Sequence, residues 1–360
     1  MIIFDAHLDL AWNAIDWNRD LRLTCEQIRK VEQEAGMTDK GRCCNTVSLP
    51  DLRRGKVVIV IATLLPRILR IGAMPAIQRF AHMEAAFGHA YGQMGYYHAM
   101  CQEGYMRWIK NWPQLDEHVT QWKADEESQK LPIGFILSME GADSILRPDQ
   151  VEEWFNLGLR IVGPTHYGVS PYGHGTSTEG GFFKPQGPEL LREMERVGMI
   201  LDVTHLSDQC FDEAMDLYHG PMLASHHNNR TLTPNQRQLT DEQTKRLVER
   251  GAVIGHALDT WMMIPNWIRG ETRTQVPLER ICDHIDRVCQ IAGNARHAAI
   301  GTDLDGGYGR EQSPFDLDTI ADLQRVPGYL KKRGYTDADI EGIMHGNWLR
   351  FFKDAWSKRK

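Results

Sequence analysis

Met199-Ile-Leu-Asp-Val-Thr-His205 and Pro221-Met-Leu-Ala-Ser-His226 are two short apolar runs, and each ends in a histidine. The segment between them, Leu206–Tyr218, has a helical pattern with Ser207 placed to cap its first turn. Strand, helix and strand in this order form a βαβ unit, whose two strands run parallel. Both histidines therefore leave the sheet at the same edge. Because neutral imidazole is the commonest metal ligand, the pair predicts a metal site there, and further strands should end in further ligands.

Other apolar runs along the chain also end in polar residues. Together with the first two they give eight expected strands, most of them followed by a helix, and this pattern predicts a (β/α)8 barrel of the TIM type. No repeat, linker or low-complexity segment divides the chain, so we expect a single α/β domain over 1–360 with a helical insertion around 76–130. The other six strands are expected at Ile2–Phe4, Lys56–Leu65, Leu131–Asp143, Leu159–Gly163, Gly251–His256 and Ala298–Gly307.

The carboxyl ends of these strands carry side chains that can bind metal. His7 and Asp9 are two residues apart, so on a strand they share a face. Glu140 follows a strongly apolar run, so we expect it to be buried, and buried carboxylates are usually paired or bound to metal. In barrels of this kind the carboxyl ends of the strands carry the active site. The residues expected there are His7, Asp9, Glu140, His166, His205, His226 and Asp303.

The composition argues against several other classes of protein. Hydrophobic residues make up 42% of the chain and charged residues 25%, as is ordinary for a globular protein. The net charge of −7 argues against nucleic acid or an anionic membrane as a partner. The amino terminus has no basic segment or cleavage site, and no apolar run approaches the roughly 20 residues that span a bilayer. With seven cysteines and no Cys-x-x-Cys pair, we expect reduced thiols and a cytoplasmic protein.

The candidate ligands suit zinc, which binds imidazole and carboxylate, and the absence of thiolates leaves positions open for water. The set could hold one ion or two. Two divalent ions about 3.5–4 Å apart need a bridging anion, and a carboxylate with two oxygens serves this purpose. Glu140, alone on its strand and near the middle of the set, is the candidate bridge.

These motifs together resemble those of the membrane (renal) dipeptidase family within the amidohydrolase superfamily. Each motif alone is weak, but they occur in the family's order and span nearly the whole chain. The start of the chain has His-x-Asp where related amidohydrolases often have His-x-His, which favours the dipeptidase branch. The matching stretches are Asp5-Ala-His7-Leu-Asp9, Ser138-Met-Glu140-Gly, Thr165-His166, Asp202-Val-Thr-His205, Ser225-His226, Arg237-Gln-Leu-Thr-Asp241, Gly301-Thr-Asp303-Leu-Asp305-Gly and Gly346-Asn347-Trp-Leu-Arg350.

The resemblance implies a site with two divalent ions, zinc in the first place, bridged by Glu140. His7 and Asp9 would complete the set around one ion, and His205 and His226 would complete the set around the other. The ligands are thus the part of the site that agrees with the family at every position.

The resemblance also implies roles for three further residues. His166 would contact the substrate and stabilise the tetrahedral intermediate, and Asp303 would transfer protons, with Asp305 as the next candidate for that task. Arg237 would bind the free carboxylate of the substrate. Without the resemblance, a solvated surface arginine is the simpler interpretation of Arg237.

The chain departs from the family pattern in regions that would surround the substrate. Leu8 stands where the family usually has Asn, the loop Tyr167–Lys184 does not match the usual loop, and the region Ala76–Trp112 is enlarged. These differences affect the expected substrate more than the expected chemistry.

The sequence therefore predicts a zinc-dependent dipeptidase, with D-configured carboxyl-terminal residues among its candidate substrates. One alternative is a hydrolase of N-acyl amino acids or another small amide. Another is a non-catalytic metal-binding paralogue, although no expected ligand is missing. We expect a small dipeptide-like substrate and neither nucleic acid nor membrane as a partner, and a homodimer is an open alternative.

Overall fold

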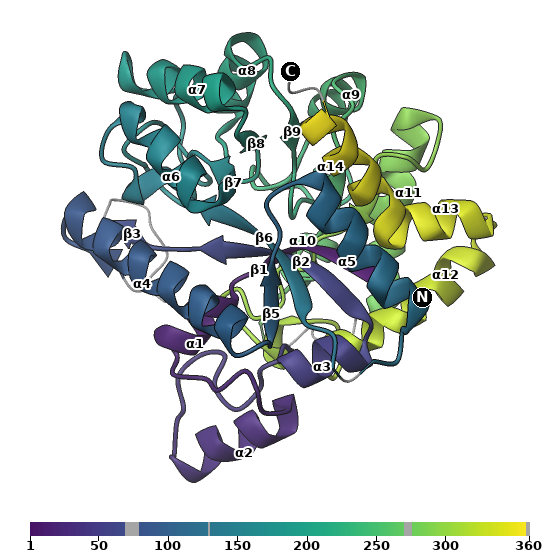
Figure 1. The fold of residues 1–360 in the computed structure, drawn as a ribbon. Helices are drawn as coiled ribbons and strands as arrows, with labels where there is room; N and C mark the ends of the chain where they lie inside the picture. Colours follow the sequence, from purple (N-terminus) through teal and green to yellow (C-terminus); the bar gives the residue numbers. More distant parts are fainter. Residues whose placement is uncertain (69–78, 129, 270–275, 358–360) are drawn as a thin grey trace.

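A curled sheet of parallel strands forms the centre of the computed structural model (Figure 1), which describes residues 1–360 except 69–78, 129, 270–275 and 358–360. The strands lie in the order β1-β2-β6-β7-β8-β9, with β5 beside β6. Their bounds are β1 Ile3–Leu8, β2 Val57–Leu64, β5 Met106–Trp108, β6 Ile133–Glu140, β7 Leu159–Gly163, β8 Ile200–Asp202 and β9 Met222–Leu223.

Two shorter pairs of parallel strands accompany this sheet. β10 (Ile254–His256) pairs with β11 (Ala298–Ile300), and β3 (Arg67–Ile68) pairs with β4 (Arg79–Phe80). A parallel bridge between Ala224 and Ile254 connects β10 to the end of β9. Each of the eight expected strands is thus present, although most are shorter than the apolar runs from which they were predicted.

Helices follow most of the strands and lie around the sheet in Figure 1. They are α1 Leu10–Ile15, α2 Cys25–Glu34, α3 Leu49–Arg54, α4 Met83–Gln102, α5 Trp112–Ala124, α6 Val151–Leu157, α7 Gln186–Val197, α8 Asp208–Leu217, α9 Asp241–Glu249, α10 Thr260–Met263, α11 Ile281–Ala292, α12 Val326–Lys332, α13 Asp337–Glu341 and α14 Asn347–Ser357. Among the described residues, no helix is both long and apolar enough to cross a membrane.

Capping side chains fix where several of these helices begin. Ser207 accepts a hydrogen bond from the Cys210 backbone N–H at 3.0 Å, which confirms its predicted role at the start of α8. Thr240 starts α9 with a capping box, in which its side chain and that of Gln243 each accept a hydrogen bond from the other residue's backbone. These caps end the loops that follow β8 and β9, and both loops contribute to the site described below.

The region 76–130 differs in detail from the helical insertion that the sequence predicts. Residues 76–78 and 129 lie outside the described residues, and the rest contains α4 and α5 with β5 between them. Met106 of β5 pairs with Ile133, at the start of β6. The prediction missed β5 because the pairing joins residues far apart in sequence, and such contacts override local helical preference.

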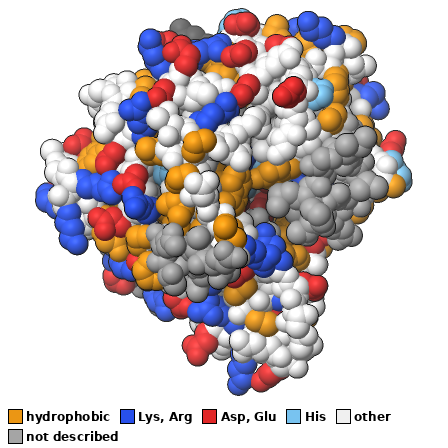
Figure 2. Space-filling model, turned by 180° about the vertical axis from the view of Figure 1, so that it is seen from behind, with side chains coloured by type: hydrophobic (Ala, Val, Ile, Leu, Met, Phe, Trp, Pro, Cys, Tyr) orange, Lys and Arg blue, Asp and Glu red, His pale blue; other side chains and the backbone are white. Residues whose placement is uncertain are grey.

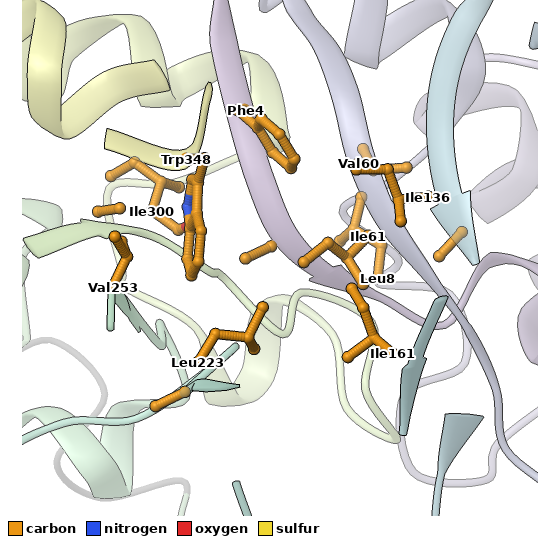
Figure 3. Packing of buried hydrophobic residues seen from close by; sticks show 14 of the residues in the cluster. Phe4, Leu8, Val60, Ile61, Ile136, Ile161, Leu223, Val253, Ile300 and Trp348 are labelled. Carbon is orange, nitrogen blue, oxygen red and sulfur yellow. The ribbon is translucent and has the colours of Figure 1, made fainter. Parts of the chain in front are cut away.

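The core fills the space inside the curled sheet, where apolar side chains from different strands point toward one another (Figure 3). Leu8, Ile61, Ile161 and Leu223 come from four strands and are fully buried. β2 is buried on both faces along its whole length, as is typical of a parallel strand covered by helices. Figure 2 shows the surface of the molecule from behind the view of Figure 1, with hydrophobic side chains across its centre and charged ones around its rim.

Trp348 packs one end of this core and ties α14 to the strands. Its indole Nε1–H donates to the Ile300 carbonyl at 3.0 Å, and its ring lies 6.1 Å from that of Phe4 between centroids. Phe4 also stacks on Phe352 at 5.6 Å. The carboxyl-terminal helix therefore covers the junction of β1 and β11.

Asp5 of β1 connects the main sheet to the β10–β11 pair, at the edge of the main sheet opposite to β9. Its carboxylate accepts hydrogen bonds from the Thr302 backbone N–H at 2.8 Å and the Thr302 hydroxyl at 2.5 Å. Asp303 N–H donates to the His7 carbonyl at 3.3 Å beside this contact. The carboxyl ends of β1 and β11 are held together by a fully buried carboxylate.

We expect Asp5→Ala to lower the free energy of unfolding by about 2–4 kcal/mol, because it leaves the buried Thr302 donors without acceptors. Chemical denaturation monitored by circular dichroism measures this loss. Asp20, an exposed carboxylate paired with Arg22, provides the matched control, and Asp20→Ala should cost less than about 1 kcal/mol. Equal losses in the two variants would contradict the role given to Asp5.

Candidate active site

The seven predicted strand-end residues meet at the carboxyl edge of the strands. His7 lies in β1 and Asp9 follows it, Glu140 is the last residue of β6, and Asp303 comes three residues after β11. The three other histidines follow β7, β8 and β9: they are His166, His205 and His226. Glu140 lies within ion-pair distance of all four histidines, and His7 lies within ion-pair distance of Asp9 and Asp303 as well.

The carboxylate of Glu140 is the centre of this cluster. Its Oε1 lies 3.1 Å from His205 Nε2, 3.3 Å from His226 Nε2 and 3.5 Å from His166 Nε2. Its Oε2 lies 3.6 Å from His7 Nε2. The two carboxylate oxygens thus face different imidazoles, which is the geometry expected of a bridging ligand.

Three triads in the cluster have ligand atoms close enough to share an ion. They are His7 with Glu140 and His226, Glu140 with His166 and His205, and His7 with Asp9 and Asp303, each within 4.8 Å. The expected ligands are all among them. His166 and Asp303, to which the family resemblance gives catalytic roles, also belong to these triads.

Hydroxyl groups fix the imidazole of His226. Ser225 Oγ–H donates to Asp202 Oδ2 at 2.5 Å, so its oxygen is left to accept the Nδ1–H of His226 at 2.8 Å. The proton is therefore on Nδ1, and Nε2 turns a lone pair toward Glu140. On His205, Nδ1 likewise pairs with the Thr176 hydroxyl at 2.9 Å.

This arrangement fits a bound cation. Nε2 of His205 and Nε2 of His226 are 3.2 Å apart, and both face a carboxylate oxygen of Glu140. His7 Nε2 is buried and has no hydrogen-bond partner among the described residues. Lone pairs and carboxylates placed so close together repel one another unless a positive ion lies between them. Hydrogen bonding through the far ring nitrogen is the usual way of orienting histidine ligands.

Burial shifts the pKa values of most groups in the cluster. It raises the pKa of Glu140 and of Asp303, since the charged carboxylate loses water. It lowers the pKa of His205 and of His226, with the neighbouring charges of Arg237 and, for His226, His7 adding to the effect. Burial also disfavours a charged His7, but the nearby carboxylates of Glu140 and Asp9 outweigh burial and raise the pKa of His7. A metal ion would compete with the proton on His7, since neutral imidazoles are the form that binds metal.

The backbone is strained at two residues of the site. His205 has φ of 67° and Asp303 has φ of 58°, in the left-handed region that side chains with a Cβ rarely adopt. Asp303 also needs Gly306, because a Cβ there would overlap Oδ1 of the Asp303 carboxylate. The loops after β8 and β11 thus turn sharply to aim these side chains inward.

Arg237 is buried, with 2% of its surface exposed, so the interpretation as a solvated surface arginine is wrong. One guanidinium nitrogen donates to the His226 carbonyl at 2.9 Å, another lies 3.5 Å from His227 Nδ1, and Nε has no partner among the described residues. Arg237 lines a pocket together with Asp9, Glu140, His166, His205 and Asp303.

Asp305, the second candidate for proton transfer, forms hydrogen bonds outside the pocket. Its carboxylate accepts hydrogen bonds from Thr46 N–H and Oγ–H, both at 2.7 Å, and from Val47 N–H at 3.0 Å. Arg19 lies 3.7 Å from it. Asp305 therefore anchors the loop before α3, and Asp303 is the acid that reaches the pocket.

The sequence did not single out several residues of the pocket. Asp259 comes three residues after the end of β10, and this position was the available signal. Thr63 of β2 donates from its hydroxyl to Asp9 Oδ1, but a threonine within an apolar run carries no signal of its own. Tyr167 also lines the pocket and begins the loop Tyr167–Lys184, which the sequence predicted to surround the substrate. Other lining residues that were not predicted are Lys40, Leu65, Trp261, Met262, Tyr308 and Gln312.

Comparison with known proteins relates the chain to dipeptidases. An uncharacterized protein in the pqqA 5′ region of Klebsiella pneumoniae is 26% identical over 58% of this chain and 76% of its own length. An uncharacterized dipeptidase of Schizosaccharomyces pombe is 27% identical over 61% of this chain and 53% of its own length. A dipeptidase of Claviceps purpurea is 26% identical over 65% of this chain. The matches to these two dipeptidases span about half of their length, 53% and 54%.

Solved structures share the fold at low sequence identity. A dipeptidase described as a metallo peptidase of family M19 has a TM-score of 0.77 and 22% identity, with 99% of each chain covered. A metallo peptidase from Rhodobacter sphaeroides, liganded with a phosphinate mimic of the dipeptide L-Ala-D-Ala, has a TM-score of 0.78 and 20% identity, again with 99% of each chain covered.

The model of the membrane dipeptidase family, peptidase family M19, matches residues 1–360, which is the whole chain. This match confirms the resemblance drawn from the motifs. The chain therefore belongs to the membrane dipeptidase family and is a metal-dependent hydrolase of that family.

Proposed function

We propose that this protein hydrolyses dipeptides with two divalent ions, zinc in the first place, bound at the site. The observation that carries the proposal is the convergence of four imidazoles on the one carboxylate of Glu140. In this proposal His7, Asp9 and Glu140 hold one ion, while Glu140, His205 and His226 hold the other. When bound, such ions polarise the scissile carbonyl and make hydroxide available near neutral pH.

The proposal includes a single (β/α)8 barrel over 1–360. The bridge from Ala224 to Ile254 on one side and the Asp5–Thr302 hydrogen bonds on the other support closure of the strands into a ring. In such a ring every strand directs its carboxyl end to the same face. The cytoplasmic location and the oligomeric state stay predictions from the sequence.

Asp303 and His166 would carry out the proton transfer and charge stabilisation. Asp303 lies 3.8 Å from His7 Nε2 and lines the pocket, so it can accept the proton of the attacking water. It would then pass this proton to the leaving amine as the C–N bond breaks. His166, also on the pocket wall, would donate a hydrogen bond to the carbonyl oxygen as negative charge develops there.

Arg237 would select substrates with a free carboxyl terminus. A guanidinium can bind a carboxylate through two parallel hydrogen bonds, and its buried position strengthens that interaction. A longer peptide would place a neutral amide beside the guanidinium of Arg237 in place of the carboxylate. This limits the substrate to one residue beyond the scissile bond.

Metal analysis combined with a substrate panel tests the proposed function as a whole. The panel should hold L,L-dipeptides, L-Ala-D-Ala and matched N-acyl amino acids. We expect two ions per chain and turnover of dipeptides, including the one with a D residue. Turnover of N-acyl amino acids alone would replace dipeptides as the substrate class, and absence of both activities in the metal-loaded protein would contradict the proposal.

Glu140→Gln should lose at least one of the two ions, because the amide offers one neutral oxygen in place of a charged bridge. Elemental analysis of the purified variant measures the loss. Glu242→Gln, an exposed change on α9, is the matched control and should keep both ions. Two ions per chain in Glu140→Gln would contradict the assignment of Glu140 as the bridging ligand.

Asp303→Asn should lower kcat by about 10²–10⁴-fold with both ions retained, because it removes the group that carries the proton. Steady-state kinetics and metal analysis on one preparation measure the two quantities together. If an ion is lost along with activity, Asp303 is a ligand, as its place beside His7 and Asp9 allows. A change in kcat of only a few-fold would rule out both roles.

Arg237→Ala should lose about 10²–10³-fold in kcat/KM on a dipeptide, the cost of leaving a buried carboxylate unpaired. The loss should be far smaller on the corresponding dipeptide amide, which has no carboxylate. Both enzymes are assayed on both substrates. Arg237 also donates to the His226 carbonyl, so equal losses would mean that it acts only by positioning that histidine.

A further inference from the structure

Lys40 lies on the wall of the pocket, and the proposed chemistry does not use it. The side chain is half-buried and forms no hydrogen bond or ion pair with any residue that the structure describes. A lysine is seldom withdrawn from water without a partner, since burial disfavours its charged form. The ammonium group is therefore available to a ligand in the pocket.

The loop that carries Lys40 is firmly anchored. The guanidinium of Arg19, itself 3% exposed, donates to the Gly41 carbonyl at 2.5 Å and to Glu32 at 2.8 Å. Arg42 donates to the Trp17 carbonyl at 2.5 Å and to Glu32 at 3.0 Å. These hydrogen bonds fix the backbone of the loop on the carboxyl-terminal side of Lys40.

This loop packs on the residues that follow β11. A Cβ at Gly41 would lie 3.5 Å from the carbonyl carbon of Tyr308, and Arg310 N–H donates to the Cys44 carbonyl at 2.7 Å. Tyr308 lines the same pocket and is 1% exposed, and its hydroxyl has no partner among the described residues. Two unpartnered donors, an ammonium and a phenol, therefore occur in one sector of the wall.

Lys40 and Arg237 belong to different sectors of the pocket. Arg237 contacts His226 and His227, which follow β9. Lys40 lies in the loop that packs on Tyr308 and Arg310, which follow β11. If Arg237 binds the carboxyl terminus and the scissile bond lies over the metal ligands, the amino-terminal residue of the dipeptide extends toward Lys40.

We propose that Lys40 binds a carboxylate in the side chain of the amino-terminal residue, so that the preferred dipeptides begin with glutamate or aspartate. This inference rests on the proposed dipeptidase function. Lys40 supplies the positive charge, and the hydroxyl of Tyr308 supplies a further donor to the same group. Asp259 forms no ion pair within the described part of the chain, and its carboxylate accepts hydrogen bonds from the neutral donors Trp261 at 2.6 Å and Gln312 at 2.9 Å.

The test compares substrates that differ only in charge, Glu-Ala with Gln-Ala. We expect the wild-type protein to prefer Glu-Ala by about tenfold or more in kcat/KM, as a partly desolvated ion pair allows. Lys40→Met should bring the ratio close to one, and Lys40→Arg should restore most of it. Lys245→Met, an exposed change on α9, is the matched control and should leave the ratio unaltered.

The outcomes separate this inference from the proposed function. A wild-type ratio near one, or a ratio that Lys40→Met does not change, overturns the inference while the protein is still a dipeptidase. A preference that appears with Ala-Glu over Ala-Gln instead overturns the assignment to the amino-terminal residue. If neither Glu-Ala nor Gln-Ala nor any other dipeptide is cleaved, the proposed function fails first, and this inference fails with it.

Discussion

The contact of one buried carboxylate with several imidazoles is the constraint around which this structure is arranged. Glu140 can face His7, His166, His205 and His226 together only if the strands that precede them run parallel and end at one level. A parallel sheet in turn requires a helix or loop between neighbouring strands, and these elements cover its outer face. The parallel strands and the helices between them thus bring the seven side chains of this cluster, from six strands, to one place.

A second layer of polar groups keeps those ligands aligned. Asp202, Ser225 and Thr176 hold the far nitrogens of His205 and His226, and Thr63 holds Asp9. These side chains are themselves buried, so each hydrogen bond is protected from competing water. Polar contacts therefore orient the cluster from outside, whereas the loops after β1, β10 and β11 form part of the pocket wall.

The strands, and the side chains that meet at their carboxyl ends, could be predicted because both follow from local patterns. An apolar run that ends in His, Asp or Glu carries the information for a strand and its ligand together, as Met199–His205 shows. The wall of the pocket could not be predicted in the same way. Lys40 and Tyr308 are 268 positions apart in the numbering (308 − 40), and only the folded loops bring their segments together. The strand β5 was missed for a related reason, since its pairing with β6 is not encoded locally.

The left-handed backbone at His205 and Asp303 lowers the free energy of unfolding of the protein. Each such residue costs of order 1–3 kcal/mol, which the surrounding packing must supply. Evolution toward stability alone would replace both residues with glycine, which adopts this conformation freely. Glycine at either position would relax the backbone but would remove the imidazole or the carboxylate from the site, so these sharp turns persist together with the side chains that they aim inward.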